Sequence, residues 1–230
     1  VDIFCVLGED EKHYRSKPPA ELLGAVEKKL KEKYGEDCVR RQRRSVSVEF
    51  DVAGQEDRVM SFDVVPAFDK DTHYEIPDAK ISEGWIDTDP EIHAEKATAA
   101  NATFSGEWKG MVRMIKRWNM EKDKPVRPSF FLEVMALDLL RPPFNGDYPY
   151  EFMAFFDSAA DRISDAWPEP AGLGPPVSDM MTNEEKTRAR QALKEASSAV
   201  REAINLSRRG QNGEALQAYR RLFGTLFPLS

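Results

Sequence analysis

The sequence predicts an α+β fold in which a mixed sheet lobe precedes a helical lobe. Strand-like segments come first along the chain and helical segments follow, an order typical of α+β proteins. The chain has 230 residues and 41% hydrophobic content, enough for one large domain or two lobes. We assign residues 1–90 to the sheet lobe and residues 91–230 to the helical lobe.

Apolar runs and alternation predict the strands. Residues 1–7 (VDIFCVL) form a short β-branched apolar run, typical of a buried strand. Residues 45–52 alternate between polar and apolar as a half-buried strand does, and residues 53–57 suit a hairpin loop. Residues 58–65 form the return strand, which Pro66 is expected to stop. Residues 68–90 are polar and predicted to be irregular.

Helical periodicity and end signals predict the helices. The first covers residues 21–34 and ends near Gly35. Asp89 and Pro90 resemble an N-cap followed by a first-turn proline, ahead of helices over residues 91–102, 106–120 and 129–141. Thr182 and Glu185 have the spacing of a capping box, which opens a helix to residue 209. A last helix covers residues 214–223.

Composition narrows the possible partners and compartments. Lysine and arginine number 33, aspartate and glutamate 40, and the net charge is -7. An acidic chain is unsuited to coating long nucleic acid, because phosphate affinity comes from excess basic residues. The two cysteines give no disulfide framework, which fits a cytoplasmic protein. No apolar run approaches the ~20 residues of a bilayer span, so we expect no membrane association.

Two aspartates lie inside apolar strand segments. Asp2 and Asp63 are carboxylates in positions where burial is costly unless the group is paired or binds a metal. Magnesium prefers such hard oxygen ligands, and adjacent strands can hold them rigidly. The alternative is that each aspartate marks a strand end and faces solvent.

A helix over residues 108–118 combines an apolar face with a basic face. At ~100° per residue, Lys109, Arg113 and Lys116 lie within about 60° of one another. Such a stripe is suited to binding a triphosphate, and the alternative is a solvated basic face.

The next helix begins at the motif Pro128-Ser129-Phe130. Ser129 is placed to cap the helix, whose N-terminus is an anion site. Phe130 offers a ring for stacking on a nucleobase. The alternative is a capped helix with Phe130 and Phe131 in the core.

Taken in order, these segments resemble the bacterial CD-NTases, the cyclic-oligonucleotide synthases of anti-phage (CBASS) systems. That family shares the polymerase β-like nucleotidyltransferase fold with oligoadenylate synthetase and cyclic GMP-AMP synthase. Its Asp-x-Asp strand is followed by a strand with a third aspartate. Residues 1–4 (VDIF) match the second half of the first motif, and residues 61–67 (SFDVVPA) match the second strand. The family's glycine–serine loop and first metal aspartate are expected directly before Val1.

The resemblance implies a set of roles. Asp2 and Asp63 would be the catalytic metal ligands, for Mg²⁺ or Mn²⁺. Lys116 would grip the donor triphosphate with help from Arg113. Ser129 would contact phosphate, and Phe130 would stack on the base.

It also implies substrates and partners. ATP, and GTP or pyrimidine nucleotides, would be condensed into a cyclic di- or oligonucleotide second messenger with release of pyrophosphate. A regulatory protein of the same defence system would be the partner. Three alternatives remain open: a linear oligoadenylate synthetase, a nucleotide-modifying transferase, and a catalytically inactive nucleotide-binding or scaffold module.

Overall fold

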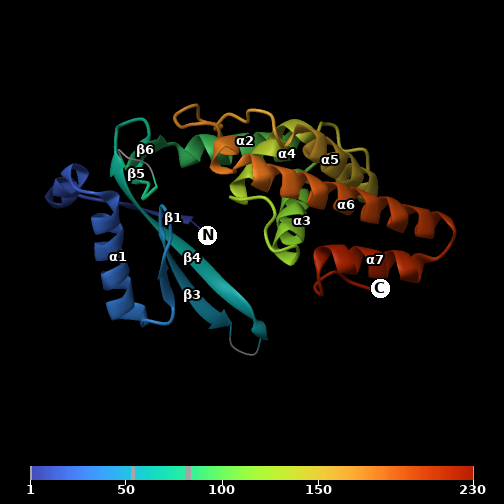
Figure 1. Ribbon diagram of the computed structural model, residues 1–230, viewed down its shortest axis with the longest axis horizontal. Helices are drawn as coiled ribbons and strands as arrows, with labels where there is room; N and C mark the ends of the chain where they lie inside the picture. Colours follow the sequence, from blue (N-terminus) through green and yellow to red (C-terminus); the bar gives the residue numbers. More distant parts are fainter. Residues whose placement is uncertain (1, 53–54, 81–83, 230) are drawn as a thin grey trace. The chain divides into compact units, whose positions relative to one another are not determined.

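The computed structural model describes residues 2–52, 55–80 and 84–229. The chain divides into two compact units, Val1–Asp89 and Pro90–Ser230. The first unit contains the sheet and the second is helical (Figure 1).

The first unit is built on a six-stranded sheet. Its strands run in the order β2-β3-β4-β5-β6, and β1 pairs with β4. The pairing of β1 with β4 is parallel, and the other pairings are antiparallel. The sheet is therefore mixed, as predicted. The strands are β1 (Asp2–Val6), β2 (Val39–Arg41), β3 (Val46–Val52), β4 (Gln55–Asp69), β5 (Tyr74–Pro77) and β6 (Trp85–Thr88).

Helix α1 (Pro19–Tyr34) packs on one face of this sheet and follows a 3-10 helix, η1 (Glu9–Ser16). Its Leu23 is fully buried and clusters with Val46 and Val48 of β3. Figure 1 shows α1 running beside β3 and β4. Because side chains alternate across a strand, the residues between these valines belong to the opposite face. That opposite face carries Ser47 and Asp63.

Strand β4 continues past Pro66, so the predicted stop at this proline is wrong. Pro66 lies opposite Cys5 of β1, and the Leu7 N–H donates to the Ala67 carbonyl at 2.9 Å. Alternate residues of a parallel strand bond to the same neighbour, so Pro66 directs its missing N–H away from β1. On that side the pairing with β3 ends at Val64. Proline therefore costs no ladder hydrogen bond here.

Three other sheet predictions need correction. Strand β1 is exposed rather than buried, with Ile3 46% and Val6 50% accessible, because it has a neighbouring strand on one side among the described residues. The region expected to be irregular contains β5 and β6. The predicted hairpin loop is shorter than residues 53–57, since Val52 pairs with Gln55; residues 53–54 lie outside the described residues.

The second unit is a helical unit with one large core. Its elements are α2 (Pro90–Thr103), α3 (Trp108–Glu121), α4 (Phe130–Leu139), α5 (Tyr148–Arg162), a 3-10 helix η2 (Val177–Met180), α6 (Asn183–Arg208) and α7 (Asn212–Phe223). The core includes Trp118, Phe131, Phe155 and Phe156, each fully buried. Five of the six helices were predicted; α5 was not.

Local chemistry explains two of these helix starts. The Thr182 side chain accepts from the Glu185 N–H, and the Glu185 carboxylate accepts from the Thr182 N–H, which confirms the capping box. For α5 the Asp147 carboxylate accepts from the Tyr150 N–H at 3.2 Å. Among the residues that the structure describes, no helix combines the length and apolar character needed to cross a bilayer.

Candidate active site

The two aspartates predicted as metal ligands are direct neighbours. Asp2 of β1 and Asp63 of β4 are partners in the parallel register. Residues opposite one another in adjacent strands point to the same face of the sheet, so both carboxylates belong to one face. Asp2 is exposed and Asp63 is half-buried. This pairing places two acids at one position without requiring order in any loop.

Hydroxyl groups extend this polar position across the sheet. Ser47 of β3 is the register partner of Asp63 on the side away from β1. It is 2% accessible, and its hydroxyl lies 3.0 Å from that of Ser61. Asp2, Asp63 and Ser47 therefore form a polar row over three strands, on the face opposite α1.

Asp63 also receives a hydrogen bond from a turn. The Gln42 side-chain amide donates from Nε2 to Asp63 Oδ1 at 3.1 Å. Gln42 lies between β2 and β3, far from Asp63 in sequence but adjacent in the fold. We did not predict this contact. The run Arg40–Arg44 suggests a basic surface turn and gives no signal that the glutamine within it reaches an acid.

The acid pair suits magnesium in the chemistry of its donors. Magnesium is commonly held by one or two carboxylates together with waters and substrate phosphates. Asp2 and Asp63 provide two carboxylates side by side. Within residues 2–52, 55–80 and 84–229, no cluster of three or more His, Cys, Asp or Glu side chains is arranged to hold a metal.

Helix α3 presents cations on the side away from its packed face. The buried face includes Met111, Ile115 and Trp118, as predicted, and the Trp108 indole N–H donates to the Ala136 carbonyl of α4 at 3.1 Å. On the other side Arg113 is exposed and Lys116 is 37% accessible in its side chain. The two cations predicted to bind phosphate thus reach solvent from a rigid helix.

Lys116 has an acidic partner that we did not predict. Its Nζ donates to Glu133 Oε1 of α4 at 2.6 Å, and the Glu133 side chain is 31% accessible. Ion pairs this exposed stabilise a protein by about 0–1 kcal/mol. A polyanionic ligand could therefore displace Glu133 at small cost.

Ser129 precedes α4, but its hydroxyl does not cap the helix. Its backbone is already helical (φ −62°, ψ −21°), and no side-chain capping bond forms. A capping residue normally has an extended backbone that turns its oxygen onto the helix N–H groups. The expected capping by Ser129 is therefore wrong, while its exposure is compatible with the expected phosphate contact.

The approach to α4 is fixed by a buried amide. The Asn119 side chain donates to the Val126 carbonyl at 2.9 Å and accepts from the Val126 N–H at 3.0 Å. Of the two phenylalanines that follow, Phe131 is fully buried. Phe130 is half-buried, and its ring centroid lies 5.0 Å from that of His93. The core alternative thus holds for Phe131 and only partly for Phe130.

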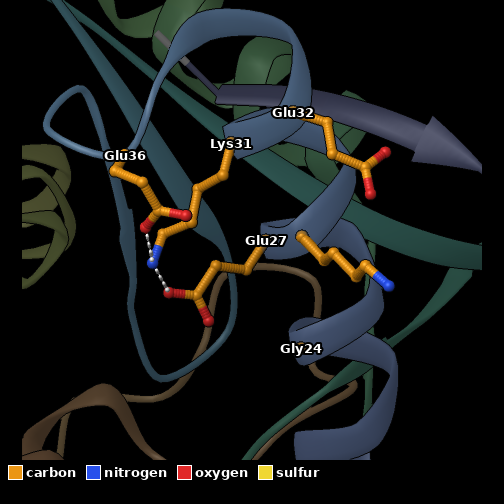
Figure 2. A pocket seen from close by; sticks show the side chains of 6 residues that line it. Gly24, Glu27, Lys31, Glu32 and Glu36 are labelled. Carbon is orange, nitrogen blue, oxygen red and sulfur yellow. Dashed lines mark ion pairs between the residues drawn. The ribbon is translucent and has the colours of Figure 1, made fainter.

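A pocket on α1 has a different character. It has a volume of about 350 Å³ and is lined by Gly24, Glu27, Lys28, Lys31, Glu32 and Glu36. Figure 2 shows Lys31 reaching between Glu27 and Glu36. Lys31 donates hydrogen bonds to Glu36 and to Glu27, and these raise the pKa of Lys31, with Glu36 contributing most. Three glutamates outnumber the two lysines in this lining, so the pocket is poorly suited to a triphosphate.

A domain-family model and two curated bacterial proteins match this chain. Residues 6–101 match the model of the Second Messenger Oligonucleotide or Dinucleotide Synthetase domain. A probable cyclic nucleotide synthase of Bacillus cereus (strain VD146) is 32% identical over 179 residues, covering 73% of this chain and 51% of the relative. The cyclic AMP-AMP-AMP synthase of Acinetobacter sp. (strain ATCC 27244 / 9458) is 26% identical over 244 residues, covering 100% of this chain and 65% of the relative. The chain therefore spans between half and two thirds of these curated relatives.

Solved structures show the same fold. CdnC of Escherichia coli MS115-1 with ATP superposes with a TM-score of 0.66 at 19% identity, covering 99% of this chain and 77% of that one. The same protein in a complex named CdnC:HORMA-deltaN gives a TM-score of 0.63 at 19% identity, covering 99% and 76%.

The mixed sheet followed by a helical unit is the nucleotidyltransferase-like fold of these solved structures. The domain match and the curated relatives narrow the class further. Over the lengths given, the chain is similar to the bacterial CD-NTases, and residues 6–101 carry the match to their synthetase domain.

Proposed function

We propose that this chain carries the catalytic residues of an enzyme that condenses nucleoside triphosphates into a cyclic di- or oligonucleotide and releases pyrophosphate. One observation carries the proposal: the register that sets Asp2 beside Asp63 on one face of the sheet. Nucleotidyl transfer depends on positioned carboxylates more than on covalent chemistry by the protein. The cyclic nucleotide synthases among the relatives support the cyclic product.

The proposed cofactor is Mg²⁺, with Mn²⁺ as a substitute, held by Asp2 and Asp63. When bound, the metal supplies neutralisation of phosphate charge and activation of the attacking hydroxyl. The protein's part is to hold both carboxylates in place and oriented. The Gln42 amide contributes a hydrogen bond to one oxygen of Asp63, and the paired strands fix the positions of both side chains.

The proposed contacts of the donor nucleotide come from α3 and α4. Lys116 binds the triphosphate after leaving Glu133, and Arg113 assists as an auxiliary cation. Charge-assisted hydrogen bonds of this kind are about twice as strong as neutral ones. The exposed Ser129 hydroxyl donates to a phosphate oxygen, and the Phe130 ring stacks on the base. ATP is the proposed principal substrate, in keeping with the ATP complex of the E. coli relative.

We further propose that the product is a second messenger in anti-phage defence, and that a regulatory protein controls its synthesis. The complex of the E. coli relative with HORMA-deltaN supports a protein partner. The assay below also measures whether GTP or a pyrimidine nucleotide serves as the second substrate.

The test is incubation of the full-length protein with labelled ATP, alone and with each other nucleotide, in the presence of Mg²⁺, followed by phosphatase. A cyclic product keeps its label through phosphatase treatment, and its formation stops on addition of EDTA. Products that lose terminal phosphates to phosphatase would identify a linear synthetase instead. Nucleotide binding without any product would identify a non-catalytic binding module, and either result would refute the proposal.

A further inference from the structure

The Gln42 side chain is held at both ends of its amide. Its Nε2 donates to Asp63 Oδ1 at 3.1 Å, and its Oε1 accepts from the Ser45 hydroxyl at 3.3 Å. The Gln42 backbone N–H donates to the Ser45 carbonyl at 2.9 Å. The bond to Asp63 distinguishes the two ends of the amide, because a carboxylate oxygen accepts hydrogen bonds and the amide oxygen could not donate one to it, whereas the Ser45 hydroxyl could pair with either end. The donor end is therefore the one that faces Asp63.

The turn that carries Gln42 is anchored by a buried aspartate. Arg43 and Arg44 donate from Nε to the two oxygens of Asp78, at 2.6 Å and 2.8 Å. Asp78 is fully buried, and its carboxylate also accepts from the Lys80 N–H at 3.0 Å. The Ala79 N–H donates to the Arg43 carbonyl at 3.1 Å. The turn is thus bound to the segment after β5 by side-chain and backbone contacts.

Gln42 is the neutral member of a basic run. Its neighbours Arg43 and Arg44 are engaged with Asp78, and Arg41 lies 3.6 Å from Glu27. An amide can fix a carboxylate oxygen by a hydrogen bond without neutralising the charge. A cation at the same position would compete with a metal for Asp63. The residue that reaches the acid therefore orients it and leaves its negative charge intact.

We propose that Gln42 is a positioning residue that orients the Asp63 carboxylate for divalent metal binding, and that the Ser45 hydroxyl and the Asp78 anchor hold Gln42 in place. This inference rests on the proposed function, because it assumes that Asp63 is a metal ligand. Outer contacts that orient a ligand typically change metal affinity 10–100-fold when they are removed. Gln42 acts through Asp63 and has no direct part in the reaction.

The experiment is a titration of the full-length protein with Mn²⁺, with free ion followed by its electron paramagnetic resonance signal. Gln42→Ala should raise the Mn²⁺ dissociation constant about tenfold. Ser45→Ala keeps the donor but frees the amide, so its effect should be smaller. Gln42→Arg should weaken binding more than Gln42→Ala. The matched control is Gln191→Ala, an exposed glutamine of α6, which should leave Mn²⁺ affinity unchanged.

Synthesis gives a second, separate readout. Gln42→Ala should raise the Mg²⁺ concentration for half-maximal rate, while KM for ATP at saturating Mg²⁺ and the thermal midpoint stay at wild-type values. Mn²⁺ affinity in Gln42→Ala equal to that of wild type would overturn the inference, as would wild-type protein that binds no Mn²⁺. If wild type makes no cyclic product, the proposed function fails, and the Mn²⁺ titration still decides the role of Gln42.

Discussion

Lys116 of α3 donates a 2.6 Å hydrogen bond to Glu133 of α4, so the proposed phosphate ligand already has an anionic partner within its own unit. Both side chains remain about one third accessible, at 37% and 31%. The pair joins the side chain of Lys116 on α3 to that of Glu133 on α4 at little energetic gain. An incoming triphosphate would then compete with Glu133 for the same ammonium group.

This competition predicts opposite effects of two substitutions on ATP affinity. Glu133→Gln removes the competing charge and should tighten ATP binding up to about fivefold, the equivalent of the ~1 kcal/mol of an exposed pair. Lys116→Gln removes a charged donor and should weaken binding at least about tenfold. Isothermal titration calorimetry measures both, with Lys122→Gln beyond the end of α3 as control. Weaker binding by Glu133→Gln would contradict the competition.

If Phe130 stacks on the base, removing its ring should weaken the binding of ATP but not the binding of a phosphate chain that lacks a base. Base–aromatic stacking contributes about 1–3 kcal/mol, so Phe130→Ala should weaken ATP binding at least about fivefold. Affinity for inorganic tripolyphosphate should stay unchanged, and Phe130→Trp should restore ATP binding. Equal losses for ATP and tripolyphosphate would mean that the substitution disturbs α4 rather than a base contact.

The Asp78 anchor predicts a dependence of stability on pH. Burial by itself would raise the pKa of Asp78, but hydrogen bonds from Arg43, the Lys80 N–H and Arg44 lower it below its ordinary 3.8. A lowered folded-state pKa stabilises the protein above the unfolded pKa, and this contribution is lost as pH falls through the folded value. Asp78→Asn should therefore cost about 3 kcal/mol at pH 7, with a smaller difference from wild type below pH ~4. Urea unfolding at both pH values measures this, and a difference that grows on acidification would contradict it.

We predict that replacing Gly84 with alanine destabilises the protein in two ways, by backbone strain and by overpacking. The same replacement at Gly106 measures the backbone strain alone. The φ of Gly84 is +76°, and an added Cβ would lie 2.3 Å from Cγ of Pro19, a rigid ring. Gly106 has a similar φ of +86° with nothing within 4 Å of an added Cβ. Gly106→Ala should cost about 1–2 kcal/mol from backbone strain alone, and Gly84→Ala should cost ~1–3 kcal/mol more from overpacking. If both substitutions lowered the free energy of unfolding equally, in thermal or urea unfolding, Pro19 would have to move aside without an energetic cost, which would contradict the overpacking.

Local patterns in the sequence predicted much of this fold. Alternation around Val46 and Val48, the capping box at Thr182 and the apolar face of α3 depend on residues near one another in the chain, and the structure contains all three. Asp2 and Asp63 could be singled out as acids within strands, and the family resemblance gave them a shared role. Their direct pairing depends on register, which local spacing does not encode.

The contacts that were missed join residues distant in sequence. Gln42 reaches Asp63, and Glu133 reaches Lys116, through the packing of separate elements. Pro66 within β4 was misjudged because its tolerance depends on where pairing with β3 ends. A proline ends a strand where its missing N–H would face a paired neighbour, and it is tolerated where that side is unpaired. Only the sheet topology shows which case applies.

The most direct test of the proposed metal site is cyclic product formation by Asp63→Asn in the full-length protein with Mg²⁺ and nucleoside triphosphates. The substitution preserves shape and removes the charge that a metal ligand needs, so product should fall by at least about 10³-fold. Circular dichroism and the thermal midpoint should match wild type, since Asp63 is only half-buried. Product at the wild-type level from a folded Asp63→Asn protein would contradict the account.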